Sequence, residues 1–150
     1  MLIAQRRKQF IDVHRDQQLI TSFDFVRRQP FTLDGRTYIG KATNILGTSF
    51  SLFDGEEAVV VEKTTSIWAD AQQIEHGGQT WAMKPARYFG KTFNVRSAGG
   101  THIGTIVPTR YFFPLSHITI DLPDDVPMVV QVFMLWLAVK SWTADTGGGT

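Results

Sequence analysis

Residues 126–142 decide the fold, and they read VPMVVQVFMLWLAVKSW. Gln131 is the one polar residue before Lys140. An amphipathic surface helix would show a polar face, and this segment has none of useful width. The pattern therefore predicts a helix over about 127–142 that is enclosed either by protein or by lipid. Asp124 and Asp125 stand just before it and are typical of a helix start, because acidic groups stabilise a helix N-terminus.

The length of this segment favours enclosure by protein. A helix from Pro127 to Trp142 would be about 24 Å long at ~1.5 Å per residue, whereas the apolar core of a bilayer needs about 30 Å. We therefore expect a helix in the core of the domain, and the four residues predicted to fill the lumen around it are Val130, Phe133, Met134 and Leu137. The alternative is a tail-anchored or monotopic membrane protein that uses residues 126–142 as its anchor.

The chain before this helix has the pattern of repeated β-hairpins. Gly and Asp tolerate the positive φ angles of tight hairpin turns, and four such dipeptides separate short β-branched and aromatic runs: Asp34-Gly35, Asp54-Gly55, Gly77-Gly78 and Gly99-Gly100. A twisted set of strands can close into a barrel, which removes its edges. The sequence predicts a mainly β (α+β) fold, an antiparallel barrel of about 9–12 strands that encloses the C-terminal helix.

The two ends of the chain are less regular. Partial alternation before residue 26 predicts two strands with a turn near Asp16-Gln17, and a short helix over residues 3–11 stays open as an alternative. We expect one domain over residues 1–142. Residues 143–150 are polar and Gly-rich, which is typical of a flexible tail.

Composition excludes several classes of protein. The chain has 150 residues, with 15 Lys and Arg against 14 Asp and Glu, and it has no Cys. It is too apolar for disorder, and it has no overall positive charge to favour nucleic acid. Its four His show no metal-ligand spacing. We expect no catalytic, cofactor-binding or metal-binding residues and no enzyme activity. Because no apolar segment follows a basic start at the N-terminus, we expect a cytoplasmic protein, which leaves peripheral attachment to a membrane open.

Two stretches carry a family resemblance. Phe93–Ile106 forms an apolar arm, a Gly-Gly turn and a return arm with Ile-Gly, as Phe31–Gly40 does around Asp34-Gly35; Ile118–Trp142 joins a Leu-Pro-Asp-Asp linker to the apolar helix. This pattern resembles the tubby C-terminal-like superfamily, which includes phospholipid-scramblase-like and LURP-one-related proteins. The resemblance implies a closed antiparallel barrel threaded by a hydrophobic helix, and contact with lipid. The chain is short for the twelve strands of that fold, and it has no acidic Ca²⁺-ligand cluster of the scramblase type.

Basic residues gather in several short clusters. The candidates for contact with anions or lipid headgroups are Arg6, Arg7, Lys8, Arg27, Arg28, Lys84, Arg87 and Lys91. Pairing of the first strands would bring Arg6–Lys8 to Arg27-Arg28, and such a patch attracts anionic headgroups at about 1 kcal/mol per basic residue. Solubilising charge on outer strand faces explains the same residues. The Tyr-Phe and Phe-Phe pairs at 88–89 and 111–113 would form a rim for a partner or a membrane if exposed.

These features favour a non-enzymatic binding module of tubby/scramblase-like type that contacts anionic phospholipid headgroups or a protein partner. A structural subunit of a larger assembly fits the same composition.

Overall fold

The computed structural model describes residues 1–43, 49–63, 71–86, 91–109 and 116–147, with side chains described as far as residue 143. These residues form twelve strands and one helix: β1 (Leu2–Arg7), β2 (Phe10–Arg15), β3 (Gln18–Asp24), β4 (Phe31–Leu33), β5 (Arg36–Ala42), β6 (Phe50–Asp54), β7 (Glu57–Lys63), β8 (Gln72–His76), β9 (Gln79–Pro85), β10 (Phe93–Ser97), β11 (His102–Pro108), β12 (Ile118–Asp121) and α1 (Met128–Gly147).

The strands form one antiparallel sheet that almost closes on itself. Consecutive strands pair along the chain from β4 to β12, and β12 then pairs with β1. On its other side β1 pairs with β2, and β2 pairs with β3. The edges of the sheet are therefore β3 and β4. They meet without a ladder, through the Thr21 hydroxyl, which donates to the Thr32 carbonyl at 2.7 Å, and through the Phe23 and Phe31 rings, whose centroids lie 6.1 Å apart. The predicted barrel is thus confirmed, with a single seam.

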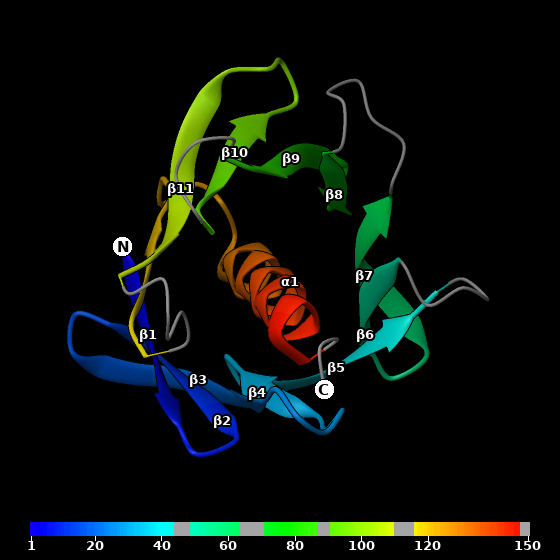
Figure 1. The fold of residues 1–150 in the computed structure, drawn as a ribbon. Helices are drawn as coiled ribbons and strands as arrows, with labels where there is room; N and C mark the ends of the chain where they lie inside the picture. Colours follow the sequence, from blue (N-terminus) through cyan, green and yellow to red (C-terminus); the bar gives the residue numbers. More distant parts are fainter. Residues whose placement is uncertain (44–48, 64–70, 87–90, 110–115, 148–150) are drawn as a thin grey trace.

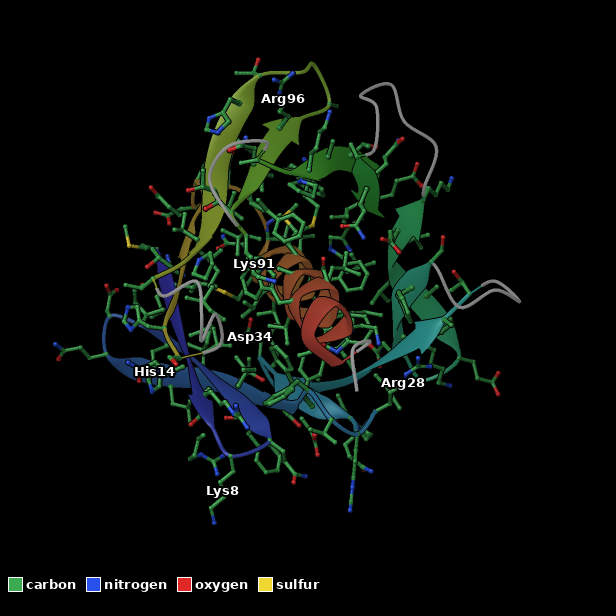
Figure 2. All side chains as sticks on the ribbon, viewed as in Figure 1. Lys8, His14, Arg28, Asp34, Lys91 and Arg96 are labelled. Carbon is green, nitrogen blue, oxygen red and sulfur yellow. The ribbon has the colours of Figure 1, made fainter. Side chains whose placement is uncertain are left out.

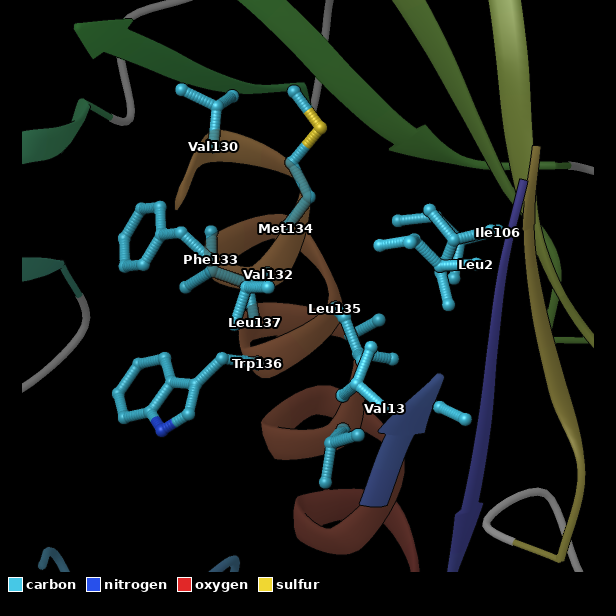
Figure 3. Packing of buried hydrophobic residues seen from close by; sticks show 14 of the residues in the cluster. Leu2, Val13, Ile106, Val130, Val132, Phe133, Met134, Leu135, Trp136 and Leu137 are labelled. Carbon is cyan, nitrogen blue, oxygen red and sulfur yellow. The ribbon is translucent and has the colours of Figure 1, made fainter. Parts of the chain in front are cut away.

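Helix α1 lies inside this barrel, with the strands arranged around its axis (Figure 1). Val130, Phe133 and Met134 are fully buried, and Leu137 is only 3% exposed. Wall residues such as Leu2, Val13 and Ile106 face the helix (Figure 3). The polar Gln131 is satisfied there because its amide donates to the Val126 carbonyl at 3.0 Å. The apolar run of the sequence is therefore the core of the barrel, as predicted.

The barrel has two ends, which we name by the course of the helix. Odd-numbered strands run from the entry end, where α1 begins, to the exit end, where α1 finishes; even-numbered strands run back. Two contacts fix this assignment. Asp124, just before α1, pairs with Arg15 at the end of β2 at 3.3 Å, and the Trp142 indole N–H donates to the Lys91 carbonyl, just before β10, at 2.9 Å.

Tight turns join the strands at the entry end. The predicted Asp34-Gly35 and Gly77-Gly78 turns have both central residues at positive φ, as a type I′ hairpin requires. Asp16-Gln17 adopts the same conformation without a Gly. Such short turns leave enough of the chain for twelve strands, which resolves the apparent shortage of length noted from the sequence.

Two inward-facing glycines let other parts of the chain approach the wall. A Cβ on Gly40 would lie 2.6 Å from the Trp136 ring of α1, and one on Gly104 would collide with the Asp121 carbonyl and the Leu122 side chain. The repeated Ile-Gly of the sequence therefore has a different steric reason in each hairpin. Gly40 admits the helix, and Gly104 admits the linker that leads into it.

Three details differ from the expectations. Residues 2–7 are a strand, so the alternative of a helix over 3–11 is wrong; β1 lies between β2 and β12 and its ladders satisfy its backbone. Asp124 and Asp125 precede the helix without capping it, since the first helical N–H bonds go to the Pro127 carbonyl. The helix continues beyond Trp142 to Gly147.

Candidate functional site

The exit end gathers the first two basic clusters of the sequence. The Arg6 guanidinium lies 5.4 Å from the centre of the Phe25 ring, and Phe25 is two residues before Arg27. The Phe25 N–H donates to the Gln9 carbonyl at 2.9 Å, which fixes the β1–β2 turn against the end of β3. Lys8 in that turn points away from the barrel wall (Figure 2). The structure thus brings Arg6–Lys8 and Arg27-Arg28 to one side of one end.

The two ends carry opposite charge. Among the described side chains, those in the exit half of the barrel are the basic Arg6, Arg7, Lys8, Arg27, Arg28, Lys41, Lys63, Lys84, Lys91 and Lys140 against the acidic Asp12, Asp24 and Glu62. Those in the entry half are the basic Arg15, Arg36 and Arg96 against the acidic Asp16, Asp34, Asp54, Glu56, Glu57, Glu75, Asp121, Asp124 and Asp125. The near-zero net charge of the chain therefore conceals a strongly polarised molecule.

Two cavities open beside the last turns of α1 at the exit end. One, of about 490 Å³, is lined by Arg28, Phe50, Gln72, Leu137, Lys140, Ser141 and Thr143. The other, of about 220 Å³, lies against the seam and is lined by residues 23–29 with Gly40, Trp136, Val139 and Lys140. Arg28 and Lys140 line both cavities, so both cavities are bordered by the same two cations.

Arg28 and Lys140 are held over the same aromatic ring. The Lys140 ammonium lies 4.4 Å from the centre of the Phe50 ring and 5.0 Å from that of Trp136. The Arg28 guanidinium lies 5.5 Å from the Phe50 centre. Burial and the nearby charge of Arg28 both lower the pKa of Lys140. Among the described side chains, neither cation forms an ion pair with a carboxylate.

A buried carboxylate supports Phe50 from behind. Glu62 is 2% exposed; it accepts the Phe50 N–H at 2.8 Å and the Gln72 amide at 2.5 Å. Burial raises the pKa of Glu62, and these two hydrogen bonds oppose that rise. Glu62 therefore fixes the two strand starts, β6 and β8, that carry Phe50 and Gln72 to the cavity.

Asp24 organises the segment that carries Arg28. Its carboxylate accepts the N–H groups of Val26 and Arg27, each at 2.8 Å, and the Gln9 amide at 2.7 Å. The bond from the Arg27 N–H is the main cause that lowers the pKa of Asp24, with the Gln9 and Val26 bonds acting in the same direction against burial. An ionised Asp24 thus holds the turn after β3 in place.

The other predicted basic residues lie apart from this group. Lys84 and Lys91 are at the exit end on the β9–β10 side of the barrel. Arg87 lies outside the described residues, as do the aromatic pairs at 88–89 and 111–113. Sequence reasoning did not select Lys140 as an anion contact. Its signal was present, because Lys140 is the one Lys or Arg in the sequence of this mainly apolar helix.

Comparison with protein-family models, with curated proteins and with solved structures finds no match to this chain. No three His, Asp or Glu side chains gather as a metal site within the part of the chain that the structure describes. In the same part of the chain, no helix is both long enough and apolar enough to cross a bilayer.

Proposed function

We propose that this protein is a non-enzymatic binding module whose exit end docks on surfaces that bear anionic phospholipid headgroups. The observation that carries the proposal is the segregation of charge among the described side chains, with most basic residues at the exit end and most acidic residues at the entry end. A bilayer with anionic lipids has a negative surface potential, and each basic residue near it contributes about 1 kcal/mol of attraction.

The polarity also orients the molecule. An anionic surface attracts the exit end and repels the entry end, so the barrel axis, and α1 within it, would stand across the surface rather than along it. Val26 is 67% exposed and stands beside Arg27, which places an apolar side chain next to a cation at the docking end. This combination is what the boundary between headgroups and acyl chains accommodates.

We also propose that the chain is related to the tubby C-terminal-like superfamily. The barrel threaded by its C-terminal helix is the arrangement which that resemblance implies, and it supports the kinship at the level of fold. Function resides in sites rather than folds, so the proposed lipid contact depends on the exit-end charges and not on the kinship.

Co-sedimentation of the full chain with vesicles tests the proposal. We expect binding to phosphatidylcholine vesicles that contain phosphatidylserine, little binding to phosphatidylcholine alone, and loss of binding as salt is raised. The variant Lys8→Glu/Lys41→Glu changes two exposed cations at the exit end and should weaken binding at least about thirtyfold, the equivalent of about 1 kcal/mol for each residue.

The matched control is Arg15→Glu/Arg36→Glu, which makes the same change in net charge at the entry end. It should bind the vesicles almost as the parent chain does. Equal losses in the two variants would show a response to net charge alone and overturn the proposal. Absence of binding by the parent chain would overturn it too, and would turn attention to an acidic protein partner.

A further inference from the structure

The cavity of about 490 Å³ between α1 and the starts of β6 and β8 has a specific electrostatic character. Two cations converge on it, and they do so over one aromatic ring. The Lys140 ammonium is 4.4 Å, and the Arg28 guanidinium 5.5 Å, from the centre of the Phe50 ring. Two like charges so placed repel each other. Because they share one ring, each cation reduces the stabilisation that the other gains from contact with it.

Nothing described around the cavity neutralises the pair. Neither cation forms an ion pair with a described carboxylate. Glu62, which supports Phe50 and Gln72, is not among the residues that line the cavity, and its carboxylate accepts the Phe50 N–H and the Gln72 amide. Contact with aromatic faces stabilises a cation without cancelling its charge. The cavity therefore has a net positive charge among the described residues, and an anion that enters it would reduce the repulsion between the two cations.

We infer that this cavity binds a phosphate monoester group, bridged between Arg28 and Lys140. The dianion of a monoester matches the two positive charges. The guanidinium offers a fork of donors for two phosphate oxygens, and the ammonium acts as a point charge on a third. Ser141 also lines the cavity, and its hydroxyl adds a donor. This inference rests on the proposed function, because both place binding at the exit end. It adds the kind of headgroup that would bind there, one with a phosphate monoester.

The dipole of α1 opposes the binding of an anion at this end of the helix, so the distance over which the dipole acts must be compared with the position of the cavity. The negative pole of a helix lies at its C-terminus and repels anions. In α1, however, the helix runs on to Gly147, so its last unpaired carbonyls lie about one turn beyond Lys140. The macrodipole falls off within the last turn, whereas Arg28 and Lys140 border the cavity itself. The two cations therefore dominate.

Calorimetric titration of the full chain with glycerol 3-phosphate tests the inference, with glycerophosphocholine as the probe that lacks a monoester. The parent chain should bind the first and not the second. Arg28→Gln and Lys140→Met should each weaken binding at least about tenfold, because each removes a charge-assisted contact. Both replace the cation by an uncharged side chain that keeps part of its aliphatic stem, and circular dichroism checks that the variants fold.

Lys41→Met is the matched control. Lys41 is at the same end of the barrel and its ammonium also lies over an aromatic ring, 5.3 Å from the centre of Phe53, but it does not line the cavity. Its affinity for glycerol 3-phosphate should match that of the parent chain, although its binding to anionic vesicles falls with the loss of one exit-end cation. An equal loss in Lys41→Met and Lys140→Met, or no binding by the parent chain, would overturn the inference.

Vesicles separate the two sources of such a group. A preference for phosphatidic acid, a monoester, over phosphatidylserine at equal surface charge, lost in Lys140→Met, assigns the cavity to a lipid headgroup. Binding of glycerol 3-phosphate without that preference assigns it to a free phosphate ester. If glycerol 3-phosphate does not bind but vesicle binding still depends on charge, the inference about the cavity is overturned. The proposed docking of the exit end is then unaffected.

Discussion

The entry and exit ends of this barrel are built from the same strands and differ in almost everything else. At the entry end the turns are tight, and both Arg15 and Arg36 are paired with carboxylates, Asp124 and Asp54, at 3.3 Å. At the exit end Arg28 and Lys140 are stacked on an aromatic ring and border open cavities. Paired charges are satisfied within the molecule, whereas unpaired ones are available to a ligand. This difference is the reason why we place the proposed docking surface at the exit end and give the entry end a role in completing the fold.

Removal of the helix should have the largest effect on both ends of the barrel. A chain that ends at Asp125 loses α1, whose Val130, Phe133 and Met134 are fully buried. The lost burial exceeds the total stability of a typical domain, about 5–15 kcal/mol, so we expect both ends to unfold together. Circular dichroism and size exclusion measure this, with a chain that ends at Gly147 as the control. A folded truncated barrel would contradict the role of α1 as the core.

The two inward-facing glycines allow the packing of the two ends to be compared. A methyl group on Gly40, toward the exit end, meets the Trp136 ring, while one on Gly104 meets the backbone carbonyl of Asp121 near the entry end. A ring can shift slightly, but a backbone carbonyl cannot move without the linker. Gly40→Ala should therefore destabilise the domain by about 1–3 kcal/mol and Gly104→Ala by about 3 kcal/mol or more.

Gly99→Ala is the control for both glycines, since a Cβ there meets nothing within 4 Å and should change stability by less than about 0.5 kcal/mol. Urea denaturation provides the values. The reverse order for Gly40 and Gly104 would mean that the linker yields more readily than the helix.

Much of the fold was predictable because its signals are local. The Asp-Gly and Gly-Gly turns fix hairpins within a few residues, and the uninterrupted apolar run of 126–142 needs enclosure wherever it lies. β1 was missed because its last residues, Gln5-Arg6-Arg7, are polar, and its backbone is satisfied by β2 and by the distant β12. No local pattern reveals a pairing of Leu2 with Ile120.

The candidate site was predictable only in part, for the same reason. Arg27-Arg28 was visible as a cluster. The partners of Arg28, however, are Phe50 from β6 and Lys140 from α1, and only closure of the barrel brings these three together. The segregation of charge between the ends was likewise hidden, because alternating strand directions distribute neighbouring residues of the sequence to opposite ends. Composition records the sum of the charges and loses their positions.

The buried Glu62 predicts a pH dependence that belongs to the exit end. Burial raises its pKa above the ordinary glutamate value, so the folded chain holds this proton more tightly than the unfolded chain does. Stability from this group is therefore greatest at low pH and declines as pH rises from the ordinary value through the raised one. Glu62→Gln should flatten that decline in thermal denaturation as the pH rises above the ordinary glutamate value.

Glu62→Ala separates charge from hydrogen bonding. It removes the acceptor of the Phe50 N–H and the Gln72 amide, and should cost about 1–3 kcal/mol near neutral pH, whereas a Gln at this position can still accept the Phe50 N–H. If Glu62→Gln and Glu62→Ala lose the same stability, the ionised carboxylate itself is what holds Phe50.

The smallest expected effect compares one ion pair from each end. At the exit end, Arg7 donates two hydrogen bonds to Asp12, at 2.9 and 3.3 Å, and Ser22 donates a third to the same carboxylate at 2.5 Å. At the entry end, Arg15 meets Asp124 at 3.3 Å, and the Asp124 side chain is 82% exposed. Exposed pairs contribute about 0–1 kcal/mol, and a second hydrogen bond and lower exposure raise the contribution. Asp12→Asn should therefore cost about 1 kcal/mol, and Asp124→Asn less than about 0.5 kcal/mol.

Salt distinguishes these two pairs further, because screening acts most on exposed charges. Urea denaturation at low and at high salt should leave most of the Asp12→Asn loss in place and abolish that of Asp124→Asn. Although burial acts against it, the hydrogen bonds from Arg7 and Ser22 lower the pKa of Asp12. Its contribution is therefore full above the ordinary aspartate pKa and should be lost as the pH falls from that value through the lowered one. A loss in Asp124→Asn as large as that in Asp12→Asn would mean that the linker into α1 depends on its ion pair. The entry end would then be held by charge as well as by its turns.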